Sequence, residues 1–508
     1  MTTPINPLLM TDGYKVAHHL MYPKDTTLVY SNFTPRSVKL MPEGAKKIVV
    51  FGVQYMVKYL HQHWDLYFFK KQKQQVCGDA KEILSSYLGC DYDVSHFEAL
   101  HDLGYLPICI KALDEGSVID DKIALLTIYN TLPEFYWVTN FLETLISSLI
   151  WKPIHSASLA YAYKKMLIKY AKETDENNLG FVDFQGHDFS FRGMQHPESA
   201  ISSGLGFLTS FKGTDTIPCL QSAKEYYDTK NIAFSVPASE HAVMTAYGKE
   251  DELGAFKRLM EQFPKGILSV VSDSFDLWKV LTEFLPKLKE LILARDGKVV
   301  CRPDSGNPVD IICGLNTNTI YDAVENESDI PKKAFLNHPS YKGVIELLWD
   351  VFGGTTNEQG YKVLDSHIGA IYGDSITLER AEQICQRLKQ KGFASTNIVL
   401  GIGSYSMGYA TRDSQGVAVK ATYCEVGGVG REIFKDPITD DGTKKSAKGL
   451  IRVFVNNKFE YEMEDSCTWE QEKMSELKKV YENGSFIKED TLDEIRNRLA
   501  KKITETEK

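Results

Sequence analysis

The sequence has few cysteines for its length, and their spacing shows no metal-binding or disulfide pattern. The chain has 508 residues and nine cysteines, an odd number scattered from Cys77 to Cys467 with no Cys-x-x-Cys pair. Zinc sites and the disulfide frameworks of secreted domains usually show closely spaced or evenly numbered cysteines. The pattern therefore argues against both, and it predicts a protein of a reducing compartment.

An excess of positive charge is also missing. Lysine and arginine together number 58 and aspartate and glutamate 68, which gives a formal net charge of −10. Proteins that bind nucleic acid generally show a basic excess, so we expect no nucleic-acid partner. A phosphate-bearing small molecule is still compatible with this charge, because a few local arginines and lysines can bind one.

Long hydrophobic runs are absent as well. The most apolar segment, Phe135 to Trp151, is interrupted by Asn140 and Glu143 and is too short and polar to span a bilayer. Residues 1–10 have neither the basic region nor the apolar stretch of a secretory signal. With 43% apolar and 25% charged residues, the composition is that of an ordinary globular protein. We therefore expect a soluble cytoplasmic protein without a membrane partner.

The middle of the chain repeats one pattern, in which a short apolar run is followed by a polar cluster and then, in most cases, a helix. The runs are Leu268–Ser272, Lys298–Cys301, Ile368–Tyr372 and Ile398–Leu400, and the clusters after them begin at Asp273, Arg302, Gly373 and Gly401. Such repeats predict a parallel sheet, in which functional residues gather at the carboxyl ends of the strands. One such cluster alone could be a helix cap, but four clusters containing arginine, aspartate and glycine favour an enzyme site.

The flanking parts of the chain predict a different organisation. Residues 1–150 mix strand-like runs with helical patterns at Gly52–Leu60 and Glu134–Ile150. The tail, Glu489 to Lys508, predicts an amphipathic helix with Leu492, Ile495, Leu499 and Ile503 facing inward. The longest gap between repeat units, residues 309–372, contains a polar stretch that predicts a surface insertion at about 315–340.

Several longer motifs occur in a fixed order along the chain. They start at Thr11 (TDGYK), His187 (HDFSFRG), Phe211 (FKGTDT), Ser235 (SVPASEH), Val270 (VVSDSFD), Arg302 (RPDSGNP), Gly373 (GD) and Thr411 (TRD). With these motifs the chain resembles the nicotinamide phosphoribosyltransferase family from about residue 8 to 455. The resemblance implies an α/β fold, an irregular (β/α) barrel of the type II phosphoribosyltransferase kind plus an α+β domain formed from both chain ends.

The resemblance also implies boundaries, assembly and chemistry. The α+β domain would comprise residues 1–150 with about 400–508, and the barrel residues 151–400 would carry most catalytic residues. Two copies would form a homodimer with shared active sites. The implied reaction joins nicotinamide to 5-phosphoribosyl 1-pyrophosphate and yields nicotinamide mononucleotide and pyrophosphate in NAD salvage. ATP with Mg²⁺ would be a cosubstrate, without a tightly bound organic cofactor and with the metal held mainly by substrate phosphates.

For the flat base, the resemblance implies stacking between Phe189 and Tyr14, the latter from the partner subunit, and a substrate contact at Asp12. It makes Asp215 the residue that reads the carboxamide. A carboxylate accepts a hydrogen bond from the amide NH₂ of nicotinamide and repels the carboxylate of nicotinic acid. Without the surrounding motifs, Phe189 would be interpreted as a core residue and Asp215 as a turn residue.

For the phosphates and the ribose, the resemblance implies fixed cations at Arg192 and Arg302 and a carboxylate, Asp304, near the ribose hydroxyls or a cation. The other expected phosphate contacts are Gly373, Asp374, Gly403, Ser404 and a cationic arm from the other subunit formed by Arg36, Arg412, Lys420 and Lys435.

His241 would be the histidine that ATP phosphorylates, with Asp273 as the acid that orients it. Taken alone, a single histidine is usually structural. A neutral imidazole oriented by a neighbouring acid is, however, a suitable phosphoryl acceptor.

Three other functions remain open from the sequence. The first is a nicotinate phosphoribosyltransferase, against which the charge of Asp215 argues. The second is a catalytically weak, ligand-binding relative, suggested by the bulkier Ser404 and Tyr405 in a loop that is usually richer in glycine. The third is a generic phosphosugar barrel enzyme, which would explain the strand-end pattern but not the ordered motifs.

Overall fold

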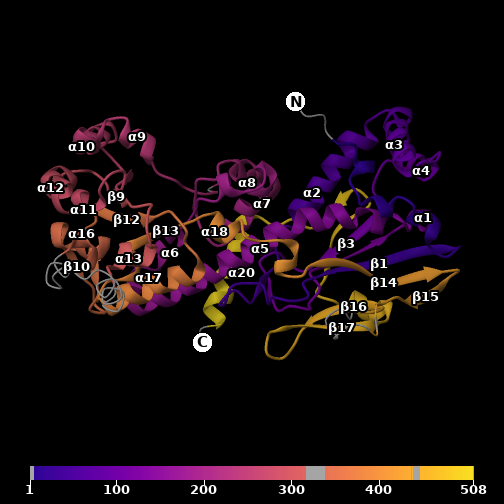
Figure 1. Ribbon diagram of the computed structural model, residues 1–508. Helices are drawn as coiled ribbons and strands as arrows, with labels where there is room; N and C mark the ends of the chain where they lie inside the picture. Colours follow the sequence, from indigo (N-terminus) through magenta and orange to yellow (C-terminus); the bar gives the residue numbers. More distant parts are fainter. Residues whose placement is uncertain (1–4, 231, 316–337, 436–437, 439–446, 507–508) are drawn as a thin grey trace. The chain divides into compact units, whose positions relative to one another are not determined.

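The computed structural model describes residues 5–230, 232–315, 338–435, 438 and 447–506. The chain forms two compact units (Figure 1). Unit 1 comprises Met1–Ser158, Gln221–Lys230 and Ala410–Lys508, and unit 2 comprises Leu159–Leu220 and Asn231–Tyr409. The predicted insertion at about 315–340 lies almost entirely outside the described residues.

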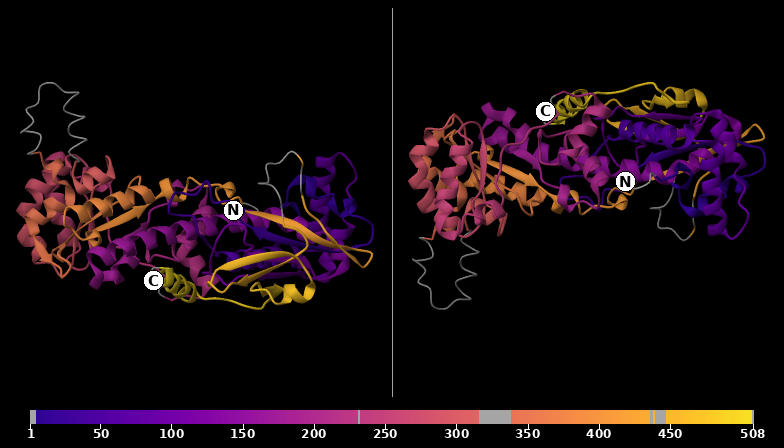
Figure 2. Two further views of the ribbon diagram at one scale, coloured as in Figure 1. Left: turned by 90° about the horizontal axis from the view of Figure 1, so that it is seen from below. Right: turned by 90° about the horizontal axis from the view of Figure 1, so that it is seen from above.

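Unit 1 is built on a seven-stranded antiparallel sheet with the order β15-β14-β1-β5-β3-β18-β19. Its strands are β1 (Thr26–Thr34), β3 (Ile108–Ala112), β5 (Leu126–Asn130), β14 (Ala418–Val426), β15 (Val429–Glu432), β18 (Lys478–Glu482) and β19 (Ser485–Phe486). Figures 1 and 2 show the orange and yellow strands from the C-terminal part beside the indigo and violet strands from the N-terminal part. The expected α+β fold formed from both chain ends is thus confirmed.

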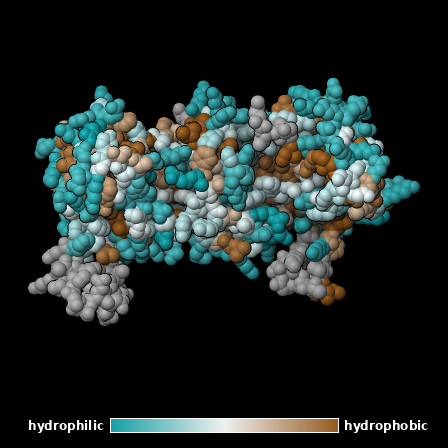
Figure 3. Space-filling model, turned by 45° about the horizontal axis from the view of Figure 1, so that its top comes forward, coloured by the Kyte–Doolittle hydropathy of each residue, from teal (hydrophilic) through white to brown (hydrophobic). Residues whose placement is uncertain are grey.

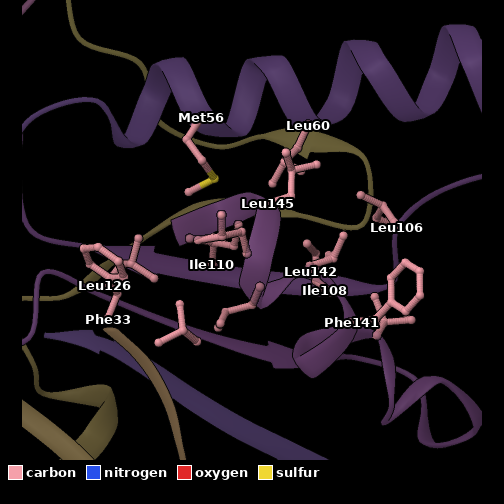
Figure 4. Packing of buried hydrophobic residues seen from close by; sticks show 14 of the residues in the cluster. Phe33, Met56, Leu60, Leu106, Ile108, Ile110, Leu126, Phe141, Leu142 and Leu145 are labelled. Atoms are coloured by element: carbon pink, nitrogen blue, oxygen red, sulfur yellow. The ribbon is translucent and has the colours of Figure 1, made fainter. Parts of the chain in front are cut away.

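The core of unit 1 lies between this sheet and its helices. Helix α2 (Val53–Trp64) directs Met56 and Leu60 toward Ile108 and Ile110 of β3 (Figure 4). Each such buried aliphatic side chain contributes about 1.5–3 kcal/mol relative to an exposed one. Helices α3 (Lys73–Leu88) and α4 (Ser95–Leu103) extend the same cluster. The C-terminal helix α20 (Leu492–Thr506) buries Leu492, Ile495, Leu499 and Ile503, as its sequence pattern predicts.

Helix α5 (Val138–Thr174) is longer than the predicted helix, which ends at Ile150. Pro153 lies inside it, although proline usually breaks or kinks a helix. The helix continues because Ile154, Ala157 and other apolar side chains beyond the proline remain buried. Gly52, which is itself buried, packs so closely against Pro153 that a Cβ there would lie 2.6 Å from the proline ring. Favourable packing on both sides of Pro153 thus outweighs the lost hydrogen bond.

Unit 2 is built on a parallel sheet with the order β7-β6-β13-β12-β9-β8. Its strands are β6 (Gly186–Asp188), β7 (Gly213–Thr214), β8 (Leu268–Val271), β9 (Val299–Arg302), β12 (Ile368–Tyr372) and β13 (Ile398–Ile402). One segment bridges the two edges, because Phe234 pairs with Gly213 of β7 and Ala238 pairs with Ser269 of β8. The sheet therefore curls into an irregular barrel, the other half of the expected fold.

Helices follow the strands as the repeated pattern predicts. They are α13 (Pro308–Cys313) after β9, α17 (Leu378–Gln390) after β12, and a helical stretch after β8 formed by α11 (Leu277–Lys279), the π-helical η8 (Val280–Phe284) and α12 (Leu285–Leu293). Gly392, just beyond α17, has a φ of 76°, a left-handed conformation that favours glycine at a helix end. In the described part of the chain, no helix is long and apolar enough to cross a membrane.

Candidate active site

The carboxyl ends of the strands in unit 2 surround a cavity of about 600 Å³. The predicted site residues that line it are Phe189, Arg192, Asp215, His241, Arg302, Asp304, Gly373, Asp374, Gly403 and Ser404. Asp273 lies directly behind this wall, with 4% of its side chain exposed. Residues separated by more than 200 positions in the sequence are thus brought to one end of the barrel, as the strand-end pattern predicts.

A second cavity, of about 550 Å³, extends into the barrel interior. It shares Phe189, Asp215 and Arg302 with the first cavity, and many of its other wall residues are apolar, such as Val300 and Val399. The three shared residues therefore stand where the polar strand-end cavity meets the apolar interior. An aromatic ring with one polar substituent suits such a boundary.

The ring of Phe189 lies on a floor of glycine backbone. A Cβ added to Gly401 would lie 2.4 Å from the ring, and one added to Gly373 would lie 3.0 Å from it. The backbone N–H of Phe189 donates to the carbonyl of Ile402 at 3.0 Å. The two glycines thus allow the ring to lie against the ends of β12 and β13, where it forms part of the cavity wall.

Asp215 has a firmly held carboxylate. His187 Nε2 lies 2.9 Å from Asp215 Oδ1, and the hydroxyl of Ser235 donates to the same oxygen at 2.6 Å. Burial alone would raise the pKa of Asp215, but these two hydrogen bonds, with the positive field of Arg302, outweigh it and lower the pKa below its usual range. The cavity therefore contains an ionised acceptor beside the Phe189 ring.

His241 begins the short helix α9 (His241–Thr245), and its imidazole is 48% exposed. Its Nδ1 lies 3.1 Å from the Ser274 hydroxyl, and its Nε2 lies 3.9 Å from Asp273 Oδ1 and 4.0 Å from Asp304 Oδ2. The arrangement is an accessible imidazole with two carboxylates near Nε2 and a hydroxyl at Nδ1.

Asp273 ties two strand ends together. Its Oδ2 accepts hydrogen bonds from the Asp304 N–H at 2.8 Å and from the Ser305 hydroxyl at 2.6 Å, and within the described residues its buried Oδ1 has no hydrogen-bond partner. Burial raises the pKa of Asp304, and Asp273 and Asp374 act in the same direction, while Arg302 opposes them. Crowded carboxylates of this kind mark a site prepared for cations or protons.

The two arginines of the site are held differently. Arg302 is partly buried and donates through Nη2 to the carbonyl of Ser239 at 2.9 Å. Arg192 is exposed in the short turn η6 (Phe191–Gly193). The next residue, Gly193, packs on Ser404, because a Cβ there would lie 2.2 Å from the Ser404 Cβ. Ser404 therefore contacts the turn that carries Arg192.

The remaining predicted residues lie in unit 1. Tyr14 is 64% exposed, and Asp12 accepts a hydrogen bond from the Thr144 hydroxyl at 2.6 Å. Arg36 donates to the Gly416 carbonyl at 2.7 Å, Arg412 lies beside Asp413, and Lys435 is exposed.

A cluster of like charges surrounds Lys420 on β14. Burial lowers the pKa of its ammonium group, Glu143 opposes this, and Arg36, Lys15 and Arg412 lower it further. The cations are Arg36, Arg412, Lys420 and Lys15. Lys15, which was not predicted, is buried and forms a salt bridge with Glu143 at 2.6 Å, so its charge is largely compensated and Arg36, Arg412 and Lys420 remain. Mutually repelling cations of this kind are stabilised by an anion. The cluster is therefore a candidate phosphate-binding surface of unit 1.

The sequence predicts no role for His187, Ser235 or Ser274, although all three lie within the ordered motifs. His187 and Ser235 reach Asp215 from a neighbouring strand and from the segment that closes the barrel. Nothing in the local pattern of a motif shows which side chains meet across strands. The alternation of side chains between the two faces of β6 could have indicated which way His187 points, but a strand of three residues is too short to show such alternation.

Two family models match the chain. The nicotinate phosphoribosyltransferase family matches residues 184–485, and the nicotinamide phosphoribosyltransferase N-terminal domain matches residues 6–102. Among curated proteins, the nicotinamide phosphoribosyltransferase of Acinetobacter baylyi is 47% identical over 99% of both chains. That of Mycoplasma pneumoniae is 37% identical over 89% of this chain and 98% of its own.

Solved structures show the same fold. A nicotinate-nucleotide pyrophosphorylase from Pyrococcus furiosus has a TM-score of 0.57 at 14% identity, covering 100% of this chain and 98% of its own. Human nicotinic acid phosphoribosyltransferase has a TM-score of 0.52 at 18% identity, covering 97% of this chain and 93% of its own. The overlap extends over both units.

Proposed function

Because this chain belongs to the nicotinate phosphoribosyltransferase family and is an enzyme related to curated nicotinamide phosphoribosyltransferases, we propose that it joins nicotinamide to 5-phosphoribosyl 1-pyrophosphate. The products are nicotinamide mononucleotide, an intermediate of NAD salvage, and pyrophosphate. The observation that carries the choice of base is the ionised carboxylate of Asp215 beside the Phe189 ring.

In this reaction the pyridine nitrogen attacks the anomeric carbon, and the bond from that carbon to the pyrophosphate oxygen breaks. Phe189 supports one face of the base, and Asp215 accepts a hydrogen bond from the amide. A nicotinate carboxylate would be repelled at the same place. By analogy with glycosyl transfer, positive charge develops on the ribose in the transition state, and the carboxylate of Asp304 is suited to stabilise it.

The charges of the cavity support a role for Mg²⁺ and for further cations. The cavity wall carries four carboxylates, from Asp215, Glu240, Asp304 and Asp374, against the guanidinium groups of Arg192 and Arg302. Among the described residues, no group of three or more histidine, cysteine, aspartate or glutamate side chains could hold a metal by itself. Mg²⁺ that neutralises the leaving pyrophosphate would therefore be held by the substrate with one or two of these carboxylates, as is usual for this ion.

ATP is proposed as a second substrate. The imidazole of His241 would attack the γ-phosphorus, the bond to the β,γ-bridging oxygen would break, and ADP would leave. Asp273 and Asp304 stabilise positive charge on the ring while the N–P bond forms. The phosphohistidine is later hydrolysed, and its charge near the pyrophosphate subsite offers a route for coupling.

We propose a homodimer with shared sites. The cation cluster around Lys420 and the exposed ring of Tyr14 lie in unit 1, whereas the cavity lies in unit 2 and has a net negative wall. Unit 1 also exposes large apolar side chains near Tyr14, at Leu20 and Met21, and Figure 3 shows hydrophobic residues on the surface.

All nine cysteines are unpaired, which supports a reducing compartment, the cytoplasm.

The decisive experiment measures product formation from phosphoribosyl pyrophosphate and Mg²⁺ with nicotinamide or nicotinic acid, with and without ATP. Nicotinamide turnover that ATP raises is the expected result. Turnover of nicotinic acid alone would overturn the role of Asp215 and favour a nicotinate enzyme. Turnover of neither base by a folded dimer would leave a ligand-binding relative.

Mixed dimers test the shared site. Tyr14→Ala and Asp215→Ala chains, each weakly active alone, should recover about a quarter of wild-type activity when refolded together, because half of the dimers would then have one intact site of two. Asp215→Ala mixed with Phe189→Ala is the control and should recover nothing, since both changes affect the same half-site. Recovery in neither mixture would contradict sharing.

The glycine floor gives a further prediction. Gly401→Ala should raise the KM for nicotinamide about tenfold or more and change the KM for phosphoribosyl pyrophosphate less, because the new methyl group would displace the Phe189 ring. Steady-state kinetics with each substrate varied measures both values. Gly78→Ala is a suitable control, since a Cβ there meets nothing within 4 Å. An unchanged KM for nicotinamide would show that Phe189 does not contact the base.

A further inference from the structure

The two oxygens of the Asp215 carboxylate are used unequally. Both hydrogen bonds, from His187 Nε2 at 2.9 Å and from the Ser235 hydroxyl at 2.6 Å, are made to Oδ1. A carboxylate oxygen has two lone pairs, so these donors occupy Oδ1 fully. Among the described residues, none makes a hydrogen bond to Oδ2. One oxygen is therefore engaged by the protein, and the other can accept from a ligand.

His187 is itself held in place. Its ring lies against Gly213, where a Cβ would lie 2.6 Å from His187 Nδ1. The centroids of the His187 and Phe189 rings are 5.0 Å apart. Only 12% of its side chain is exposed. Because Nε2 faces a carboxylate oxygen, Nε2 carries a proton. The imidazole is thus a fixed donor rather than a mobile one.

Ser235 and the backbone of Asp215 are fixed by the barrel. Ser235 follows Phe234, which pairs with Gly213 on β7, and the Asp215 N–H donates to the carbonyl of Asp188 at 2.9 Å. Two hydrogen bonds thus hold the Asp215 side chain, and a third holds its backbone.

We infer that His187 and Ser235 are positioning residues, which lock the Asp215 carboxylate so that Oδ2 alone is presented to the amide of nicotinamide. The inference rests on the proposed function. A carboxylate free to rotate would exchange its two oxygens and weaken both the hydrogen bond to the amide and the repulsion of an acid. Discrimination between nicotinamide and nicotinic acid is then a property of three side chains rather than of Asp215 alone.

The test compares single and double variants by steady-state kinetics. His187→Ala and Ser235→Ala should each raise the KM for nicotinamide about tenfold and leave the KM for phosphoribosyl pyrophosphate within about twofold of wild type. Each should also lower the ratio of kcat/KM for nicotinamide to kcat/KM for nicotinic acid. His187→Gln, which keeps a donor near the position of Nε2, and Ser235→Thr, which keeps the hydroxyl, should restore most of the affinity.

The Asp215→Ala background separates positioning from a general structural role. In that background neither His187→Ala nor Ser235→Ala should raise the KM for nicotinamide further, because the carboxylate that these residues position is gone. His367→Ala removes a comparable histidine–aspartate contact, 2.7 Å from Asp365, that lines neither cavity, and it should change no KM by more than about twofold.

The outcomes are distinguishable. A further tenfold rise of the KM for nicotinamide in the Asp215→Ala background would overturn the inference. An unchanged KM for nicotinamide in both single variants would also overturn it, provided that the wild-type enzyme turns over nicotinamide. If His187→Ala does not fold, Ser235→Ala and His187→Gln decide. A wild-type protein without nicotinamide turnover would overturn the proposed function, and this inference with it.

Discussion

Replacing His241 by alanine is expected to lower ATP hydrolysis at least about a thousandfold and to make nicotinamide mononucleotide formation insensitive to ATP. The effect is large because the imidazole is the proposed phosphoryl acceptor. Among the described residues, the hydroxyl of Ser274 is the only one that contacts the imidazole of His241. A serine hydroxyl is a far weaker phosphoryl acceptor than an imidazole at neutral pH.

The surroundings of His241 explain why this histidine is suited to the step. Its Nε2 faces two carboxylates at 3.9 and 4.0 Å, one of which has an oxygen that is buried without a hydrogen bond. An unpartnered buried carboxylate oxygen is costly, and it gains a partner when positive charge develops on the ring. Asp273 therefore stabilises the phosphorylated or protonated ring more than the resting one.

Release of labelled phosphate from ATP, together with acid-labile label on the protein, measures the step. His338→Ala is a matched control, because His338 is another exposed histidine whose Nδ1 contacts a serine hydroxyl, at 2.7 Å from Ser340. It should leave ATP hydrolysis unchanged. ATP hydrolysis by His241→Ala within about tenfold of wild type would mean that the phosphoryl group goes directly to water.

Four strands of the parallel sheet in unit 2, β8, β9, β12 and β13, could be predicted from the sequence because each of these buried runs ends at a polar cluster. The short strands β6 and β7 were not predicted. The run Ile368–Tyr372 is β12 residue for residue, and Leu268–Ser272 exceeds β8 by one residue. Parallel strands of this kind are buried on both faces, and so they stand out as short apolar runs. The gathering of Asp273, Arg302 and Gly373 at one end of the barrel follows from that pattern alone.

The sheet of unit 1 could not be predicted in the same way. Thr34 of β1 pairs with Ala418 of β14, almost 400 positions away, and β18 from the C-terminal part of the chain pairs with β3 from the N-terminal part. Local periodicity has no information on such partners, so the fold of both chain ends came from resemblance. The same holds for contacts across strands, such as His187 with Asp215, and for the floor beneath Phe189, which depends on the absence of a side chain at Gly401.

Glu115 of unit 1 gives the second large expected effect, on stability. Its side chain is almost completely buried, and its Oε1 accepts the backbone N–H of Gln54 at 2.7 Å. Burial raises the pKa of Glu115 from 4.5 to about 7, the nearby Asp490 adds to this, and the groups of Gln54 and Tyr227 oppose it. The folded protein therefore binds this proton more tightly than the unfolded chain does.

The sign of the pH dependence follows from this difference. The free energy of unfolding should fall as pH rises from about 4.5 to about 7, because in this window the folded state retains a proton that the unfolded chain has lost. The contribution is present below pH 4.5 and lost above about pH 7. The shift corresponds to about 3 kcal/mol at full effect.

Glu115→Gln should remove this dependence while keeping an acceptor for the Gln54 N–H. The variant should match wild type at pH 5 within about 1 kcal/mol, and at pH 8 it should be more stable by about 3 kcal/mol, or roughly 5–10 °C in Tm. The exposed Glu43→Gln should show no such divergence. Thermal unfolding of the three proteins from pH 5 to 8 measures the difference. A stability difference that does not change with pH would mean that Glu115 is already ionised in the folded protein throughout this pH range.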